Sequence, residues 1–185
     1  LNNCLIVCAE TYSKYIDKND RTTKTIFSDA AAVCLLEKNT NSKFLFSPFE
    51  FGLDGKGASN LIVKGSGARK EKNCNNNHLF MDGSKVFMFT MNEIPKFVNN
   101  LLKKNNINIS DIDLFIFHQA SKLVLDTLST KLNLPAEKVF SNLSTVGNTV
   151  SCSIPIAICD AIDQKKIFKG STIMLVGFGV GYSWG

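Results

Sequence analysis

The sequence predicts an α/β fold built on a mostly parallel, mixed sheet with helices on both of its faces. The apolar run DLFIF at 113–117 does not alternate with polar residues, which is typical of a strand buried on both faces. Apolar residues at helical spacing occur on both sides of that run. The resulting order of strand, helix, strand, helix and strand favours parallel strands joined by right-handed crossovers.

The N-terminal region begins with a short apolar run, NCLIVCAE at 3–10, which predicts a buried strand. The run AAAVCLLEKN at 30–39 fits a strand or a helix equally well. Residues 39–77 are rich in Gly, Ser, Asn and Lys, which indicates loops and a hairpin. The glycine-rich stretch at 52–60 does not match the phosphate-loop pattern, so we interpret it as turns.

Two helices are predicted around the central strand. The second covers 119–132 and ends before Pro135, with Val124, Leu128 and Leu132 on one side. The first has Ser84 as its expected N-cap, and Pro95 removes one hydrogen bond inside it. Its apolar stripe consists of Phe87, Met91, Ile94, Val98 and Leu101.

The C-terminal part continues the alternation. KVFSNL at 138–143 predicts a strand, and TIMLVGFG at 172–179 predicts the last one. Between them, 153–166 predicts a helix with Pro155 in its first turn, where proline is tolerated. The buried face of that helix is expected to carry Ile154, Ile158 and Ile162.

Composition and charge exclude several classes of protein. With 44% hydrophobic and 20% charged residues, the 185-residue chain is in the range of a globular domain with a real core. No apolar run approaches the roughly 20 residues of a membrane span, and no basic leader is present, so we expect a cytoplasmic protein without membrane contact. The net charge of +5 suits an acidic partner. No basic run is interleaved with aromatics, which argues against nucleic-acid binding.

The six cysteines form no CxxC pair, which favours free thiols in a reducing compartment. Cys74 and His78 have a zinc-like separation, but no second pair completes four ligands, so we expect no metal site. A strand-like run follows Leu1 almost at once. This start fits either a cut inside a domain or a missing leader.

Polar and glycine residues follow three of the predicted strands. His118 follows 113–117, Asn148 follows 138–143, and the glycines at 177–181 follow the last apolar run. Because the carboxyl ends of parallel strands meet at one edge of a sheet, these residues are expected to converge. Each residue alone also fits a packed or turn position. Together, a histidine and an asparagine could donate two hydrogen bonds to one oxygen and stabilise an enolate or oxyanion.

At these residues the sequence resembles the 3-oxoacyl-[acyl-carrier-protein] synthase III family of the thiolase-like superfamily. The motifs that carry the resemblance are HQAS at 118–121, VGNTVSCSIPIAI at 146–158 and GFGVGYSWG at 177–185. Two earlier stretches, at 20–33 and 80–89, are also similar. The resemblance implies a thiolase-like fold, of which this chain would hold the end of the N-terminal half (1–45), a connection (46–83) and the C-terminal half (84–185).

The resemblance also implies a decarboxylative Claisen condensation of an acyl-coenzyme A with malonyl-acyl-carrier-protein, with no cofactor beyond these substrates. It makes His118 and Asn148 the catalytic pair that stabilises the enolate, and it places the backbone of Gly179 and Val180 in an oxyanion hole. Lys122 would contact the acidic carrier protein, and a homodimer is implied. The residues matched to substrate binding are Arg21, Met81, Gly83, Ser84, Phe87, Ala120, Ser121 and Phe178.

The sequence departs from the family pattern in several places. The family's nucleophilic cysteine lies before Leu1, so we expect that residue 1 is a cut and that this chain alone is inactive. We also expect an apolar surface that the missing part would cover. Ser84 and Ser121 stand where the family commonly has asparagine, and SDAAA at 28–32 replaces a glycine-rich turn.

Two other hypotheses stay open. One is acyl transfer to an alcohol or amine without decarboxylation, in which His118 acts as a general base. The other is a non-catalytic binding domain that keeps the fold.

Overall fold

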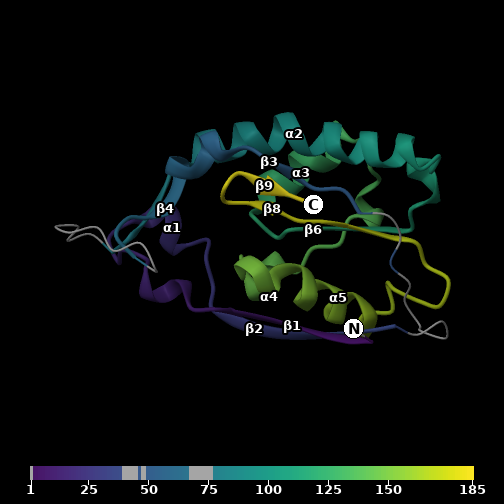
Figure 1. Ribbon diagram of the computed structural model, residues 1–185, viewed down its shortest axis with the longest axis horizontal. Helices are drawn as coiled ribbons and strands as arrows, with labels where there is room; N and C mark the ends of the chain where they lie inside the picture. The colour runs from purple at the N-terminus through teal and green to yellow at the C-terminus, as the bar shows by residue number, and fades with distance from the viewer. Residues whose placement is uncertain (1, 39–45, 47–48, 67–76) are drawn as a thin grey trace.

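The computed structural model describes residues 2–38, 46, 49–66 and 77–185, and Figure 1 shows them as successive layers. Helix α2 (Gly83–Lys104) lies along one side of the strands that include β6 (Leu114–Phe117) and β8 (Phe178–Gly179). Helix α5 (Ser153–Asp163) lies on the other side, between those strands and the ribbon of β1 and β2. The layering places helices on both faces of the central strands.

Strand β6 pairs in parallel with β7 (Ile173–Val176), from Leu114 opposite Ile173 to Phe117 opposite Val176. All four residues of β6 are buried, as the unbroken apolar run predicts. Phe115 and Phe117 face the core under α2, whereas Leu114 and Ile116 face the core under α5. The other strand pairs in the described part of the chain are antiparallel and belong to separate sheets, so four of the five strand pairs depart from the mostly parallel pairing that the sequence predicts.

The strand predicted at 138–143 is wrong. This segment forms a 3₁₀ turn, η4 (Ala136–Lys138), one parallel bridge from Val139 to Phe115, and helix α4 (Leu143–Val146). The buried side chain of Gln119 explains the change, because its amide donates to the Phe140 carbonyl at 3.4 Å and accepts from the Asn142 N–H at 3.2 Å. The Gln119 side chain thus forms hydrogen bonds with backbone groups that a neighbouring strand would otherwise have bound.

Helix α2 confirms the first predicted helix, and it includes Pro95. Its N-cap is Asp82 and not Ser84, because the Asp82 carboxylate accepts from the Lys85 N–H at 3.0 Å. Helix α3 (Lys122–Lys131) confirms the second, with Ser121 as its N-cap.

Helix α5 follows the 3₁₀ turn η5 (Val150–Cys152) and confirms the predicted C-terminal helix. The prediction for its buried face is partly wrong. Ala157 and Ala161 are fully buried, Ile154 and Ile158 are half-buried, and Ile162 is exposed. Small side chains occupy the centre of this face because the helix packs closely between β6 and β2.

Strands β1 (Asn3–Glu10) and β2 (Ala30–Glu37) form an antiparallel ribbon, which settles the ambiguity at 30–39 in favour of a strand. The expected burial of β1 is wrong, since one face of the ribbon is open. Leu5 lies opposite Leu35 and Val7 opposite Val33, and all four side chains are more than half exposed. This face is the apolar surface that the sequence analysis expects.

Short elements complete the described chain. Strand β4 (Leu61–Val63) pairs with β5 (Leu79–Met81), so the expected hairpin ends at Met81, four residues beyond 77. The glycine-rich stretch is largely the 3₁₀ helix η2 (Gly55–Asn60). No helix among the described residues is long and apolar enough to cross a membrane. The remaining elements are η1 (Tyr12–Lys14), α1 (Arg21–Lys24), β3 (Gly52–Leu53), η3 (Ile109–Asp111) and β9 (Ser183–Trp184).

Candidate functional site

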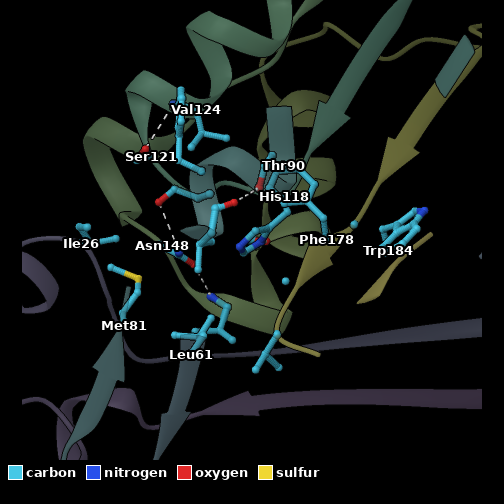
Figure 2. A pocket seen from close by; sticks show the side chains of 18 of the residues that line it. Ile26, Leu61, Met81, Thr90, His118, Ser121, Val124, Asn148, Phe178 and Trp184 are labelled. Atoms are coloured by element: carbon cyan, nitrogen blue, oxygen red, sulfur yellow. Dashed lines mark hydrogen bonds between the residues drawn. The ribbon is translucent and has the colours of Figure 1, made fainter. Parts of the chain in front are cut away.

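A cavity of about 1060 Å³ lies where the carboxyl end of β6 meets the start of α2 and the C-terminal turn (Figure 2). Eleven of the thirteen residues that the sequence analysis assigns to the site line this cavity. They are Met81, Gly83, Ser84, Phe87, His118, Ala120, Ser121, Asn148, Phe178, Gly179 and Val180. The convergence of three separate segments at one edge is therefore confirmed.

His118 is the first residue after β6, and its N–H extends the parallel ladder by donating to the Val176 carbonyl at 2.8 Å. The imidazole meets the Phe178 ring edge to face, with centroids 5.3 Å apart. Its Nδ1 lies 2.6 Å from the hydroxyl oxygen of Ser153. Burial lowers the pKa of His118 from 6.5 to about 4, so the ring is neutral at pH 7.

Asn148 is held in place by its backbone and by its carboxamide. Its N–H donates to the Ile26 carbonyl at 3.0 Å, and its carbonyl accepts from the Ser28 N–H at 2.9 Å. Gly147 precedes it at φ 68°, where a Cβ would lie 2.6 Å from the Ser28 hydroxyl, so only glycine suits this turn.

The carboxamide of Asn148 has one orientation that satisfies both of its neighbours. Oδ1 accepts from the Val150 N–H at 2.9 Å, and Nδ2 donates to the Ala120 carbonyl at 3.3 Å, as the dashed lines in Figure 2 mark. Nδ2 has two N–H groups and only one of them is bound, so its second N–H remains as a donor for a ligand.

Val150 has φ 54°, a conformation that is unfavourable for a β-branched residue. It lines the cavity, and its N–H is the donor that orients Asn148. Backbone strain of this kind is found mainly at functional sites, where the surrounding structure stabilises it.

Two residues assigned from the sequence lie outside the cavity wall. Arg21 is exposed at the first position of α1, a few residues before Ile26 and Phe27, which do line the cavity. Lys122 is exposed at the first position of α3, where it forms an ion pair of 2.6 Å with Asp126. Their roles toward coenzyme A and a carrier protein stay predictions.

Sequence reasoning missed several lining residues. Tyr12 and Phe27 bring a pair of aromatic rings, with centroids 5.1 Å apart, to the wall. Ser153 was also missed, although a short polar residue at the start of a predicted helix was a visible signal. Further lining residues include Ile26, Leu61, Thr90, Val150, Ile154 and Trp184.

No cysteine among the described residues lines the cavity. Of the described cysteines, Cys152 is the nearest in sequence to the lining residues. It is fully buried, and its thiol contacts the Ala30 carbonyl at 3.4 Å. Burial raises its pKa, which keeps it a thiol. Cys74 of the zinc-like pair lies outside the described residues, and the rest of the described chain contains no cluster of three or more His, Cys, Asp or Glu side chains suited to a metal ion.

The fold places the chain in the class of thiolase-like proteins. A solved 3-oxoacyl-(acyl-carrier-protein) synthase III superposes with a TM-score of 0.93 at 34% identity, covering 99% of this chain and 58% of that one. The synthase III from Pseudomonas aeruginosa superposes with a TM-score of 0.88 at 30% identity, covering 99% of this chain and 56% of that one.

The chain belongs to the 3-oxoacyl-[acyl-carrier-protein] synthase III family. The model of that family matches residues 1–55, and the model of its C-terminal domain matches 102–185. The beta-ketoacyl-[acyl-carrier-protein] synthase III of Microcystis aeruginosa is 36% identical, over 99% of this chain and 57% of that protein. That of Porphyra umbilicalis is 34% identical, over 100% and 58%. The chain thus spans somewhat more than half the length of these relatives.

Proposed function

We propose that the intact protein catalyses a decarboxylative Claisen condensation between an acyl-coenzyme A and malonyl-acyl-carrier-protein, as part of fatty acid synthesis or a specialised pathway. The observation that carries the proposal is the pairing of His118 and Asn148 in one cavity. Asn148 offers a free N–H because Nδ2 donates only one of its two protons, to the Ala120 carbonyl, and His118 is a neutral imidazole. Such a pair suits a developing negative charge on a single thioester oxygen.

In the proposed reaction, a cysteine thiolate takes the acyl group from coenzyme A and releases the coenzyme A thiolate. The C–C bond to the malonyl carboxylate then breaks, carbon dioxide leaves, and the electron pair moves into the thioester to form an enolate. His118 and Asn148 hold the enolate oxygen. The enolate carbon attacks the acyl carbonyl, and the cysteine leaves as a thiolate. That cysteine is not among the described cysteines, none of which lines the cavity.

Other cavity residues would position the two substrates. We propose that the backbone N–H groups near Gly179 and Val180 bind the oxyanion formed on the acyl carbonyl, beside the ring of Phe178. The walls formed by Met81, Gly83, Ser84, Phe87, Ala120 and Ser121 would hold the pantetheine and acyl chains. Arg21 and Lys122, both exposed outside the wall, would meet coenzyme A and the acidic carrier protein. The homodimer stays a prediction of the resemblance, and the cytoplasmic location stays a prediction from the sequence composition.

The low pKa of His118 favours this reaction over acyl transfer to an alcohol or amine. A general base works best with a pKa near the working pH. An imidazole with a pKa of about 4 is a weak base at neutral pH, but it remains a good hydrogen-bond donor.

The proposal predicts that His118→Ala and Asn148→Ala each slow malonyl decarboxylation about 100- to 1,000-fold, because each removes one donor to the enolate oxygen. The measurement is release of labelled carbon dioxide from malonyl-acyl-carrier-protein by the intact protein, together with mass spectrometry of the acylated cysteine. Acyl loading should persist in both variants, since it does not form the enolate.

The matched control is His78→Ala. His78 lies outside the cavity, with its Nδ1 3.7 Å from Asp17. This variant should decarboxylate at the wild-type rate. Decarboxylation at that rate by His118→Ala would contradict the proposal. Acyl transfer to amines or alcohols without carbon dioxide release would favour the alternative reaction.

A further inference from the structure

Among the described residues, Ser153 is the one in direct polar contact with the His118 ring, and the proposed function gives it no role. It is the first residue of α5, thirty-five positions after His118, and it is 2% exposed. Its hydroxyl oxygen lies 2.6 Å from Nδ1 of His118. Within the described part of the chain, this is the only hydrogen bond of the Ser153 side chain.

The direction of this hydrogen bond follows from counting donors and acceptors. A neutral imidazole carries one proton, on either Nδ1 or Nε2. If Nδ1 donated to Ser153, the serine hydroxyl proton would have no acceptor among the described residues, and a buried donor without a partner is unfavourable. If the serine hydroxyl donates to Nδ1, both groups are satisfied and the imidazole proton resides on Nε2.

We propose that Ser153 is a positioning residue that holds His118 in the tautomer with its proton on Nε2, the nitrogen left to donate to a ligand in the cavity. The histidine tautomer is generally set by the hydrogen bond made at the other ring nitrogen. The assignment of the tautomer stands on the hydrogen-bond geometry together with the neutral state of the ring. Its catalytic consequence rests on the proposed function.

Asn148 is arranged in the same way. Its acceptor atom, Oδ1, is occupied by the Val150 N–H, just as Nδ1 of His118 is occupied by the Ser153 hydroxyl. Both partners belong to one short segment, η5 and the first residue of α5. This segment therefore converts two side chains that could donate or accept into two donors facing the cavity. A site so arranged favours an oxygen that gains negative charge during reaction.

The test is ¹⁵N NMR of histidine-labelled intact protein, including any sequence that flanks these 185 residues. Signals of His118 are assigned by their loss in His118→Gln. We expect a protonated Nε2 and an unprotonated Nδ1 in the wild type. A proton on Nδ1 of the wild-type protein would overturn the proposal without any variant.

Variants extend the test. Ser153→Ala should give a mixture of tautomers or the Nδ1–H form, and it should lower kcat for malonyl decarboxylation about 10-fold, less than loss of the whole donor. Ser153→Thr, which keeps a hydroxyl, should restore the Nε2–H signal. Ser129→Ala is the matched control, since the Ser129 hydroxyl binds the Leu125 carbonyl inside α3. An unchanged tautomer in Ser153→Ala would contradict the proposal.

The two proposals fail separately. If the wild-type protein releases no carbon dioxide, the proposed function is wrong, yet the NMR spectra still decide whether Ser153 sets the tautomer. If decarboxylation occurs with a proton on Nδ1, the proposed function stands and the role of Ser153 is wrong.

Discussion

Gly57 lies directly against the ring of Tyr182, and this contact joins η2 to the C-terminal turn beside the cavity. A Cβ at Gly57 would approach the Tyr182 ring to 2.3 Å. Tyr182 cannot move away easily, because it stacks on Phe89 with centroids 4.0 Å apart and its hydroxyl accepts from Asn60 at 2.8 Å. The absence of a side chain at residue 57 is what allows the aromatic stack to form.

Gly57→Ala is expected to destabilise the protein by about 1–3 kcal/mol, since an added methyl in a packed site forces side chains off their rotamers. Gly55→Ala, in the same 3₁₀ helix, is the control, because a Cβ there meets no atom within 4 Å. Its effect should stay within about 0.5 kcal/mol. Urea unfolding of the intact protein measures the free energy of unfolding of each variant. Equal values for the two variants would show that the Tyr182 ring moves to accommodate the added methyl group.

Helix α2 begins at the cavity wall, since its first residues, Gly83 and Ser84, line the cavity. The position of this start is set by Asp82, whose carboxylate accepts from the Lys85 N–H. That hydrogen bond is the main cause that lowers the pKa of Asp82, so the capping group is a carboxylate at neutral pH. A negative charge there also suits the positive end of the helix dipole.

Asp82→Ala should lower the free energy of unfolding by about 1 kcal/mol, the usual effect of losing an N-cap. Ser84→Ala tests the cap that the sequence predicted. Ser84 is exposed and is not the cap, so its loss should change the free energy of unfolding by less than about 0.5 kcal/mol. Thermal unfolding followed by circular dichroism compares the two. A larger effect for Ser84→Ala would place the cap at residue 84.

At the scale of the whole molecule, two cores enclose β6, and the end of that strand carries His118 into an apolar environment. The pKa of His118 is about 4 in the folded protein and 6.5 for an ordinary histidine. Between these values the unfolded chain binds one more proton than the folded one. The contribution of His118 to stability is therefore complete above pH 6.5 and is lost as the pH falls toward 4.

The free energy of unfolding should accordingly fall by up to about 2 kcal/mol between pH 7 and pH 5 on account of His118, at 1.36 kcal/mol per pKa unit. The comparison is His118→Gln, which has no titratable group at residue 118 and should lose less stability over that range. Asp20, Asp29 and Asp82 have lowered pKa values, so their contributions to stability are lost only below pH 3.8. They therefore do not affect the change between pH 7 and pH 5. Identical slopes for the two proteins would contradict the burial of His118.

Many features of this protein follow from short stretches of sequence. The unbroken apolar run at 113–117 determines a strand buried on both faces, and the helical stripes determine α2 and α3. His118 follows the predicted strand at 113–117 and lines one cavity with Asn148, although the strand predicted before Asn148 does not form. The motifs at 118–121, 146–158 and 177–185 indicate the family, which the comparisons confirm. These features were predictable because each depends on periodicity or on a local motif.

Other features depend on contacts between residues far apart in sequence, and only the tertiary structure decided them. Gln119 replaces the predicted strand at 138–143 by binding backbone groups more than twenty positions away. An exposed apolar surface was expected, but its place on the β1–β2 ribbon was not, because an apolar run does not say what covers it. The contact of Ser153 with His118 likewise joins two segments that no local pattern links. Sequence by itself determined which groups could do chemistry, and packing determined which of their atoms are free to do it.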